Sequence, residues 1–223
     1  MEEIQVKNLK IFTGFLEKFD REGALRWCLS MLDGGMNVPE LYEQVLAPAL
    51  NRIIVGREEE HDMIWREHVM TAIVRSVVEN ALPYVLRQRD AAPKGSKPRV
   101  LLTCPEQEYH ELGIRMGADF FVIAGFDVTY IGCNTPLSNI LSAAKALNPH
   151  VVCLGATNYL SLSAMLKIIP ELRRMEGFNA RILLSGSALR HTGHSARDFG
   201  ADGSIATFAD VQELRRGFHE NGI

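Results

Sequence analysis

The sequence predicts an α/β protein in which an N-terminal four-helix bundle precedes a doubly wound, five-stranded parallel sheet. Three observations support this fold class. Residues 1–89 carry apolar side chains at helical spacing, residues 90–98 lose every periodicity, and residues 99–223 alternate short apolar runs with amphipathic stretches. We therefore expect a helical cap at 1–89, a linker at 90–98 and an α/β domain at 99–223.

The bundle is predicted from four amphipathic segments that are joined by short turns. The first is expected around residues 3–18, and the second ends at Gly34-Gly35. In the third, Asn37 is the expected N-cap, with Pro39 in the first turn and Gly56 as the C-cap. The apolar face of this third helix comprises Leu41, Val45, Leu46, Ala49, Leu50 and Ile53. The fourth helix is expected to be the long stretch "HDMIWREHVMTAIVRSVVENALPYVLRQR".

The second half begins after "DAAPKGSKP", whose Pro, Gly, Ser and Lys content is typical of a linker. Five apolar runs are predicted as strands: "RVLLTCP", "FDVTYIGC", "HVVCLGAT", "ARILLSGSA" and "DGSIATF". Helices are expected around 111–124, 137–147, 161–176, 194–199 and 209–220. In such a sheet, ligands bind at the carboxyl ends of the strands, near the switch point. The candidate loops therefore follow Pro105, Cys133, Thr157, Ser185 and Phe208.

The composition is that of an ordinary soluble globular protein. The chain has 223 residues, of which 47% are hydrophobic and 23% charged, and its formal net charge is -3. This balance argues against a broad nucleic-acid-binding face. The N-terminus "MEEIQVKNLK" is too acidic and polar for a signal peptide, and we judge no apolar stretch long enough to span a bilayer. We expect a cytoplasmic protein without a membrane partner.

Cysteine and histidine spacing does not indicate a zinc site. The four cysteines lack any C-x-x-C pair and are expected to be buried thiols in a reducing compartment. The stretch "HTGH", 191–194, has a metal-like spacing, but we interpret it as the turn after the fourth strand. The chain also lacks G-x-G-x-x-G, a P-loop and a nucleophile elbow, so neither a nucleotide nor a catalytic residue is predicted.

The stretch "EYHELG", residues 108–113, follows the first predicted strand and allows two interpretations. In the first, it is a helix start, where the acid suits the helix dipole and His110 is a polar loop residue. In the second, His110 points outward as a ligand or base, and Glu108 orients it. The six residues alone do not decide between them.

Three motifs at predicted strand ends resemble the cobalamin-binding domain family. That family carries an acidic residue, then x-His-x-x-Gly, after its first strand, Ser-x-Leu after the third, and Gly-Gly after the fourth. The corresponding stretches here are "EYHELG" at 108–113, "TNY" at 157–159 and "GS" at 186–187. The resemblance spans nearly the whole chain. It implies a flavodoxin-like, corrin-binding domain preceded by a four-helix cap.

The resemblance implies that His110 is the lower axial ligand of the cobalt. Imidazole is a natural ligand for an axial position, and a carboxylate that accepts the other ring N–H fixes the tautomer, a role suited to Glu108. Thr157 is expected to extend this relay, and small residues are expected to leave room for the nucleotide tail. The expected cofactor contacts in this domain are Glu108, Tyr109, His110, Glu111, Leu112, Gly113, Gly155, Thr157, Tyr159, Ser161, Ser185, Gly186 and Ser187.

The resemblance is strongest to the cobalamin-dependent photoreceptor repressors, which share Glu in the histidine motif, "TPL" and the pattern of "REHVMT". It implies that cap residues face the upper side of the corrin: Arg57, Glu67, His68 and Thr71. Arg57 and Glu58 depart from the repressors, which have tryptophan over the adenosyl group and histidine as the cobalt trap. Because the bundle begins almost at residue 1, we expect no DNA-binding domain.

Three functions remain open at this point. The first is a cobalamin-binding sensor that takes part in transcription regulation through partner proteins, without direct contact to nucleic acid. The second is a corrinoid methyl carrier serving separate methyltransferases. The third is a haem sensor that uses the same histidine. The expected partner is a regulator or a methyltransferase, a homo-oligomer is compatible with the sequence, and the upper ligand is not indicated.

Overall fold

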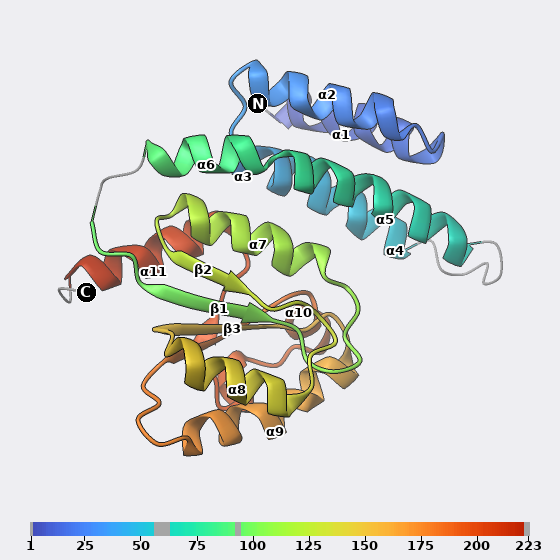
Figure 1. Ribbon diagram of the computed structural model, residues 1–223. Coiled ribbons are helices and arrows are strands. Elements are labelled where there is room, and N and C mark those ends of the chain that lie inside the picture. The colour runs from blue at the N-terminus through green and yellow to red at the C-terminus, as the bar shows by residue number, and fades with distance from the viewer. Residues whose placement is uncertain (1, 56–62, 92–94, 221–223) are drawn as a thin grey trace. The chain divides into compact units, whose positions relative to one another are not determined.

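The computed structural model describes residues 2–55, 63–91 and 95–220. The chain divides into two compact units, Met1–Gln88 and Arg89–Ile223. The first is helical, and the second contains a five-stranded parallel sheet with helices on both faces (Figure 1). This arrangement confirms the predicted fold class.

The helical unit follows the four predicted segments, with two internal changes. Its elements are α1 (Glu2–Glu17), α2 (Arg21–Asp33), α3 (Val38–Leu41), a π-helical turn (Tyr42–Leu46), α4 (Ala47–Val55), α5 (Met63–Asn80) and α6 (Leu82–Asp90). The chain is helical without interruption from α3 to α4. The predicted fourth helix is instead broken at Ala81, because Pro83 cannot donate a helical hydrogen bond and is tolerated only in the first turn of α6.

The start of α3 is the N-cap that the sequence predicts. The Asn37 side chain accepts the backbone N–H of Glu40 at 2.8 Å, and the Glu40 carboxylate accepts the backbone N–H of Asn37 at 3.2 Å. Pro39 lies in the first turn, where its missing N–H costs nothing. Gly56, the expected C-cap, lies outside the described residues.

One segment, Ile64–Asp90, is long and apolar enough by length and composition to cross a membrane. The expectation that no such segment exists was therefore wrong. The segment covers α5 and α6, and its Val74, Val77 and Val85 are fully buried in the helical unit. A core helix of a bundle passes the same test, so the finding is weak evidence for a membrane span.

The sheet of the second unit has the strand order β2-β1-β3-β4-β5, and all pairs are parallel. The strands are β1 (Arg99–Thr103), β2 (Asp127–Tyr130), β3 (Val151–Gly155), β4 (Arg181–Ser185) and β5 (Gly203–Ser204). Each lies within an apolar run that was predicted as a strand. The winding reverses between β1 and β3, which creates the switch point at the centre of the sheet.

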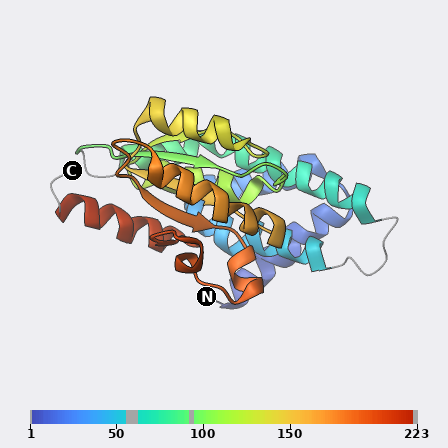
Figure 2. The same ribbon diagram turned by 90° about the horizontal axis from the view of Figure 1, so that it is seen from below.

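Helices cover both faces of the sheet (Figures 1 and 2). They are α7 (Leu112–Ile123), α8 (Leu137–Leu147), α9 (Tyr159–Arg174), α10 (Ala188–Thr192) and α11 (Phe208–Glu220). α8 and α9 pack on one face over a core that includes Leu101, Val152 and Leu154. On the other face, α7 and α11 meet through aromatic contacts such as Phe120 with Phe208. The expected helix at 194–199 is only a 3-10 turn, Ala196–Phe199, and the sequence did not predict α10.

Candidate functional site

Two loops meet at the carboxyl edge of the sheet, beside the switch point. One joins β1 to α7 across residues 104–111, and the other joins β3 to α9 across residues 156–158. Because β1 and β3 are adjacent and parallel, both loops leave the sheet at the same edge. "EYHELG" and "TNY" are therefore brought together, although about fifty residues separate them in the sequence.

Glu108 is the centre of this site, and its side chain is fully buried. Its Oε1 accepts the backbone N–H of His110 at 3.0 Å and lies 2.7 Å from His110 Nδ1. Its Oε2 accepts the backbone N–H of Thr157 at 2.9 Å and the Thr157 hydroxyl at 2.7 Å. Both carboxylate oxygens are thus satisfied by groups of the two loops.

Glu108 is ionised at neutral pH despite its burial. Burial by itself raises the pKa of a carboxyl group. Hydrogen bonds from the side chain and backbone of His110, and from Ser161 and Thr157, outweigh that effect and lower the pKa of Glu108 to about 2. The site therefore holds a buried negative charge beside an imidazole.

The His110 ring has one defined tautomer at Nδ1. An ionised carboxylate only accepts hydrogen bonds, so the 2.7 Å contact to Glu108 places a proton on Nδ1. The neutral ring then carries its lone pair on Nε2, the atom able to bind a metal. The side chain is 46% exposed at the edge of the sheet. The arrangement agrees with the second interpretation of "EYHELG", in which Glu108 orients the histidine.

Asn158 also supports the site, a role that the sequence analysis missed. Its Oδ1 accepts the backbone N–H of Ser161 at 2.9 Å and so caps α9, while its Nδ2 donates to Glu108 at 3.4 Å. Asn followed three residues later by Ser is a recognisable helix start, so a signal was present. The cap fixes the start of α9 next to the buried carboxylate.

Two expected cofactor contacts are buried inside the protein instead. The Ser161 hydroxyl accepts the backbone N–H of Asn158 at 3.2 Å and completes the cap of α9. Leu112 is buried as the first residue of α7. Neither presents its side chain at the surface of the site. By contrast, Tyr109 of "EYHELG" and Tyr159 of "TNY" are 66% and 69% exposed, so both present a large apolar side chain to solvent.

The small residues differ in what they accommodate. A Cβ on Gly186, whose φ is +99°, would lie 2.1 Å from the carbonyl oxygen of Ala156, so glycine is required by the close approach of two backbones. A Cβ on Gly155 would meet Cys104 Sγ at 2.8 Å and Ile114 Cδ1 at 3.1 Å. Both glycines are therefore required by the protein's own packing, and their expected place beside the nucleotide tail stays a prediction. Among the three glycines expected to contact the cofactor, Gly113 alone has no atom within 4 Å of an added Cβ.

The remaining predicted residues of this unit lie around the rim. The Ser187 hydroxyl donates to the carbonyl oxygen of Thr157 at 3.2 Å, and Ser185 is half-buried at the end of β4. Glu111 accepts hydrogen bonds from the Tyr130 hydroxyl at 3.2 Å and from the Cys133 thiol at 3.7 Å. These contacts tie the ends of β2, β3 and β4 to the two loops.

The predicted cap residues belong to the other unit or lie outside the described residues. Glu67, His68 and Thr71 lie on α5, in the helical unit. Arg57 and Glu58 lie outside the described residues. Their proposed place at the upper face of the corrin stays a prediction.

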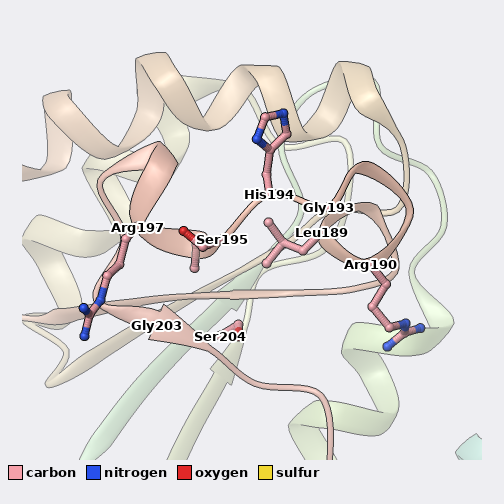
Figure 3. A pocket seen from close by; sticks show the side chains of 9 residues that line it. Leu189, Arg190, Gly193, His194, Ser195, Arg197, Gly203 and Ser204 are labelled. Atoms are coloured by element: carbon pink, nitrogen blue, oxygen red, sulfur yellow. The ribbon is translucent and has the colours of Figure 1, made fainter.

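A separate surface pocket of about 440 Å³ lies beside β5 and includes part of "HTGH". Figure 3 shows Arg190 and Arg197 on opposite sides of it, pointing away from each other. His194 Nδ1 lies 3.7 Å from an Asp198 carboxylate oxygen. The interpretation of "HTGH" as a turn holds only for Gly193 and His194, because His191 and Thr192 form the end of α10.

The described residues contain no group of three or more His, Cys, Asp or Glu side chains that could hold a bare metal ion. The four cysteines are free; Cys28, Cys104 and Cys153 are buried and Cys133 is half-buried. A single oriented imidazole therefore suits a metal whose other ligands come with it. The donor chemistry of His110 and Glu108 fits an axial position of cobalt in a corrin.

A parallel sheet with one carboxylate-oriented histidine at its switch point suits a protein that binds a metal cofactor whose other ligands come with it. Residues 98–213 match the B12 binding domain, and the chain belongs to this family. Cobalamin is therefore its cofactor. The haem alternative gains no support.

Two relatives and one solved structure show how far the similarity extends. The chain is 27% identical over 173 residues to the dimethylamine corrinoid protein of Methanosarcina barkeri, covering 76% of this chain and 78% of that protein. It is 34% identical over 120 residues to the HTH-type transcriptional repressor CarA of Myxococcus xanthus, covering 54% of this chain and 38% of the repressor. The monomethylamine corrinoid protein of Methanosarcina barkeri has the same fold, with a TM-score of 0.72, 14% identity, and coverage of 93% of this chain and 96% of that one. These names agree with the expectation that the chain is not a complete enzyme by itself.

Proposed function

We propose that the chain is a corrinoid carrier protein that holds cobalamin with His110 as the lower axial ligand and presents it to a separate methyltransferase. The observation that carries the proposal is the extent of the match to the dimethylamine corrinoid protein. Its 173 residues exceed the length of the sheet unit, so the similarity includes part of the helical unit. The match to the repressor, in contrast, covers 38% of that protein.

The residues of the site have distinct roles in this proposal. His110 supplies Nε2 as the ligand atom, and Glu108 holds the proton on Nδ1. Thr157 keeps the carboxylate in place through its backbone N–H and hydroxyl. Bound cobalamin supplies a cobalt that can accept and release a methyl group. Tyr109 and Tyr159 offer exposed apolar surface for contact with the cofactor.

The ligand assignment is tested with His110→Ala, and His191→Ala serves as the control. Both histidines are exposed residues of the sheet unit, but His191 lies on α10 and is not in the Glu108 network. Each purified variant is mixed with hydroxocobalamin, and its absorbance spectrum and dissociation constant are recorded. We expect His110→Ala to remain folded and to lose the nitrogen-ligated spectrum, and His191→Ala to match the wild type. If His110→Ala keeps both the spectrum and the affinity, the assignment is wrong.

The carrier role is tested separately from cofactor binding. Methylcobalamin-loaded protein is incubated with methyltransferases of the methylamine class and an amine as methyl acceptor. Loss of the methyl–cobalt spectrum is followed as the methyl group passes to the amine nitrogen and the two bonding electrons stay on cobalt as Co(I). Catalytic demethylation supports a carrier. Failure with these enzymes, combined with tight cobalamin binding, shifts the proposal to the second candidate.

The second candidate is a cobalamin sensor acting through a regulator, favoured by the 34% identity to the repressor CarA. We infer that a sensor would discriminate between upper ligands, whereas a carrier would accept small ones. The measurement is the binding of hydroxo-, methyl- and adenosylcobalamin in darkness and light, with Arg57→Trp as a probe of the upper face. A strong preference for adenosylcobalamin with a light-dependent spectrum favours the sensor.

A further inference from the structure

Asn134, from the β2 side, holds the part of the loop that leads into His110. The backbone N–H of Asn134 donates to the carbonyl oxygen of Glu108 at 2.9 Å. The Asn134 side chain accepts the backbone N–H of Gln107 through Oδ1 at 2.8 Å. Asn134 therefore binds two consecutive residues of the segment that leads into His110.

Both partners in this contact have left-handed backbones. φ is 51° at Asn134 and 67° at Gln107, a region that costs an L-residue about 1 kcal/mol or more. Asparagine tolerates it better than most side chains, whereas glutamine has no such preference. A strained conformation persists only where surrounding contacts impose it, and such residues gather at functional sites. Gln107 lies inside a turn closed by the Glu108 backbone N–H to the Pro105 carbonyl oxygen at 3.1 Å, and its own backbone N–H donates to Asn134.

Asn134 itself is anchored to the end of β1. The next residue, Thr135, is buried; its backbone N–H donates to Cys104 at 3.1 Å, and its hydroxyl lies 3.0 Å from that of Thr103. Thr103 in turn donates to the carbonyl oxygen of Gly132 at 3.0 Å. The β2–α8 loop is thus fixed to β1. Through Asn134, this loop also fixes the β1–α7 loop that carries His110.

Glu108 is therefore held at both of its ends. Thr157, from the β3 side, holds its carboxylate, and Asn134, from the β2 side, holds its backbone carbonyl. We propose that Asn134 is a positioning residue for the cobalt ligand His110, acting through Gln107 and Glu108. The inference rests on the proposed role of His110 as the lower ligand, and neither the sequence motifs nor the relatives' names assign it.

The test separates the side-chain hydrogen bond from the backbone strain. Asn134→Gly keeps the left-handed backbone without strain but removes the acceptor. Asn134→Asp keeps both the acceptor and the tolerance for that backbone. Asn148→Gly is the matched control, because Asn148 also has a positive φ, of 42°, but caps the end of α8 at the opposite edge of the sheet.

The readouts are the dissociation constant for hydroxocobalamin and the electron paramagnetic resonance spectrum of the Co(II) form, in which a bound nitrogen splits the lines. Loss of one hydrogen bond should weaken binding by Asn134→Gly about tenfold and reduce its nitrogen-split fraction. Asn134→Asp should stay within about twofold of the wild type and so rescue the ligation, and Asn148→Gly should not differ from wild type. Thermal unfolding checks that each variant is folded, and Asn134→Ala replaces Asn134→Gly if the latter does not fold.

His110→Ala, measured in parallel, distinguishes the two possible failures. If the wild type shows no nitrogen splitting that depends on His110, the proposed function is wrong. If that splitting is present and the folded Asn134 variants without an acceptor retain it at wild-type affinity, only the positioning role is overturned.

Discussion

Two histidines lie at opposite edges of the same sheet, and their rings are bound in opposite ways. At the carboxyl edge, His110 Nδ1 faces the Glu108 carboxylate at 2.7 Å. At the amino edge, His150 Nδ1 accepts the backbone N–H of Arg99 at 3.0 Å, and the ring packs edge-on against Phe218. His110 must carry its proton on Nδ1, whereas His150 must carry its lone pair there.

The difference teaches that the partner of Nδ1 decides what a histidine can do. When Nδ1 donates to a carboxylate, the lone pair of the neutral ring is on Nε2 and can bind a metal. When Nδ1 accepts an N–H, its lone pair is already used in a structural hydrogen bond. Burial, followed by the charge of Arg99, lowers the pKa of His150, which keeps it neutral and able to accept. His150 is thus a structural residue and His110 a ligand candidate.

The largest effect should come from Glu108→Gln. This variant removes the carboxylate charge next to His110, which has no counterpart next to His150 at the other edge of the sheet. Because the pKa of Glu108 is about 2 against an ordinary 4.5, the charge stabilises the folded state by about 3 kcal/mol at neutral pH. We expect the free energy of unfolding in urea to fall by that amount, and cobalamin binding to weaken because the tautomer is no longer enforced. Glu106→Gln, an exposed acid of the same loop, should change neither property. Equal effects of the two variants would refute the role of the buried charge.

The same charge predicts a pH dependence of stability. A group whose pKa is lower in the folded state stabilises fully above its ordinary pKa and loses that contribution as the pH falls through its folded pKa. For Glu108 the loss should begin near pH 4.5 and continue to about pH 2. Unfolding free energies measured across this window should fall more steeply for the wild type than for Glu108→Gln. Parallel curves would contradict the lowered pKa.

An intermediate effect on the free energy of unfolding is expected at Thr157, whose hydroxyl is one of the groups that hold the Glu108 carboxylate. Thr157→Val removes the hydroxyl that donates to Glu108 but keeps the backbone N–H, so stability should fall by about 1.5 kcal/mol. Thr157→Ser retains the hydroxyl and should lose only a few tenths of a kcal/mol. Calorimetry of the pair distinguishes hydrogen bonding from packing, and indistinguishable losses would favour packing.

The smallest effect is expected at the amino edge. His150→Phe keeps the ring contact with Phe218 but leaves the Arg99 N–H without its acceptor, at a cost of about 1 kcal/mol. Because the pKa of His150 is lowered, the wild type loses this advantage as the pH falls below the ordinary 6.5. The gap between the two unfolding free energies should therefore narrow in acid, while cobalamin binding stays unchanged. A changed cofactor spectrum would show that the two edges are not independent.

Much of this molecule could be predicted from local sequence patterns. Apolar runs located all five strands, and the N-cap at Asn37 followed from residue type and spacing alone. The motif "EYHELG" drew attention to Glu108 and His110, and their predicted contact is present, because an acid two residues before a histidine is a short-range signal. Such features depend on residues close together in the chain.

The missed features depend on contacts between distant loops. Nothing in the periodicity marks Asn134 as the partner of Gln107, since neither residue is a glycine and 27 positions separate them. Gly186 was expected to leave room for the tail, and the sequence did not reveal its second constraint, the backbone of Ala156 in the loop after β3. Pro83 was a visible helix breaker that the apolar pattern of the long segment concealed.

The long-range bonds of Glu108 also bear on how the protein is made. Thr157 follows Glu108 by 49 residues, so a ribosome adding about 5–20 residues per second delivers it roughly 2–10 s later. Until then the carboxylate stays solvated and His110 lacks its oriented partner. The cofactor pocket is therefore completed only after β3 has docked beside β1. We thus expect cobalamin to bind after β1 and β3 have paired.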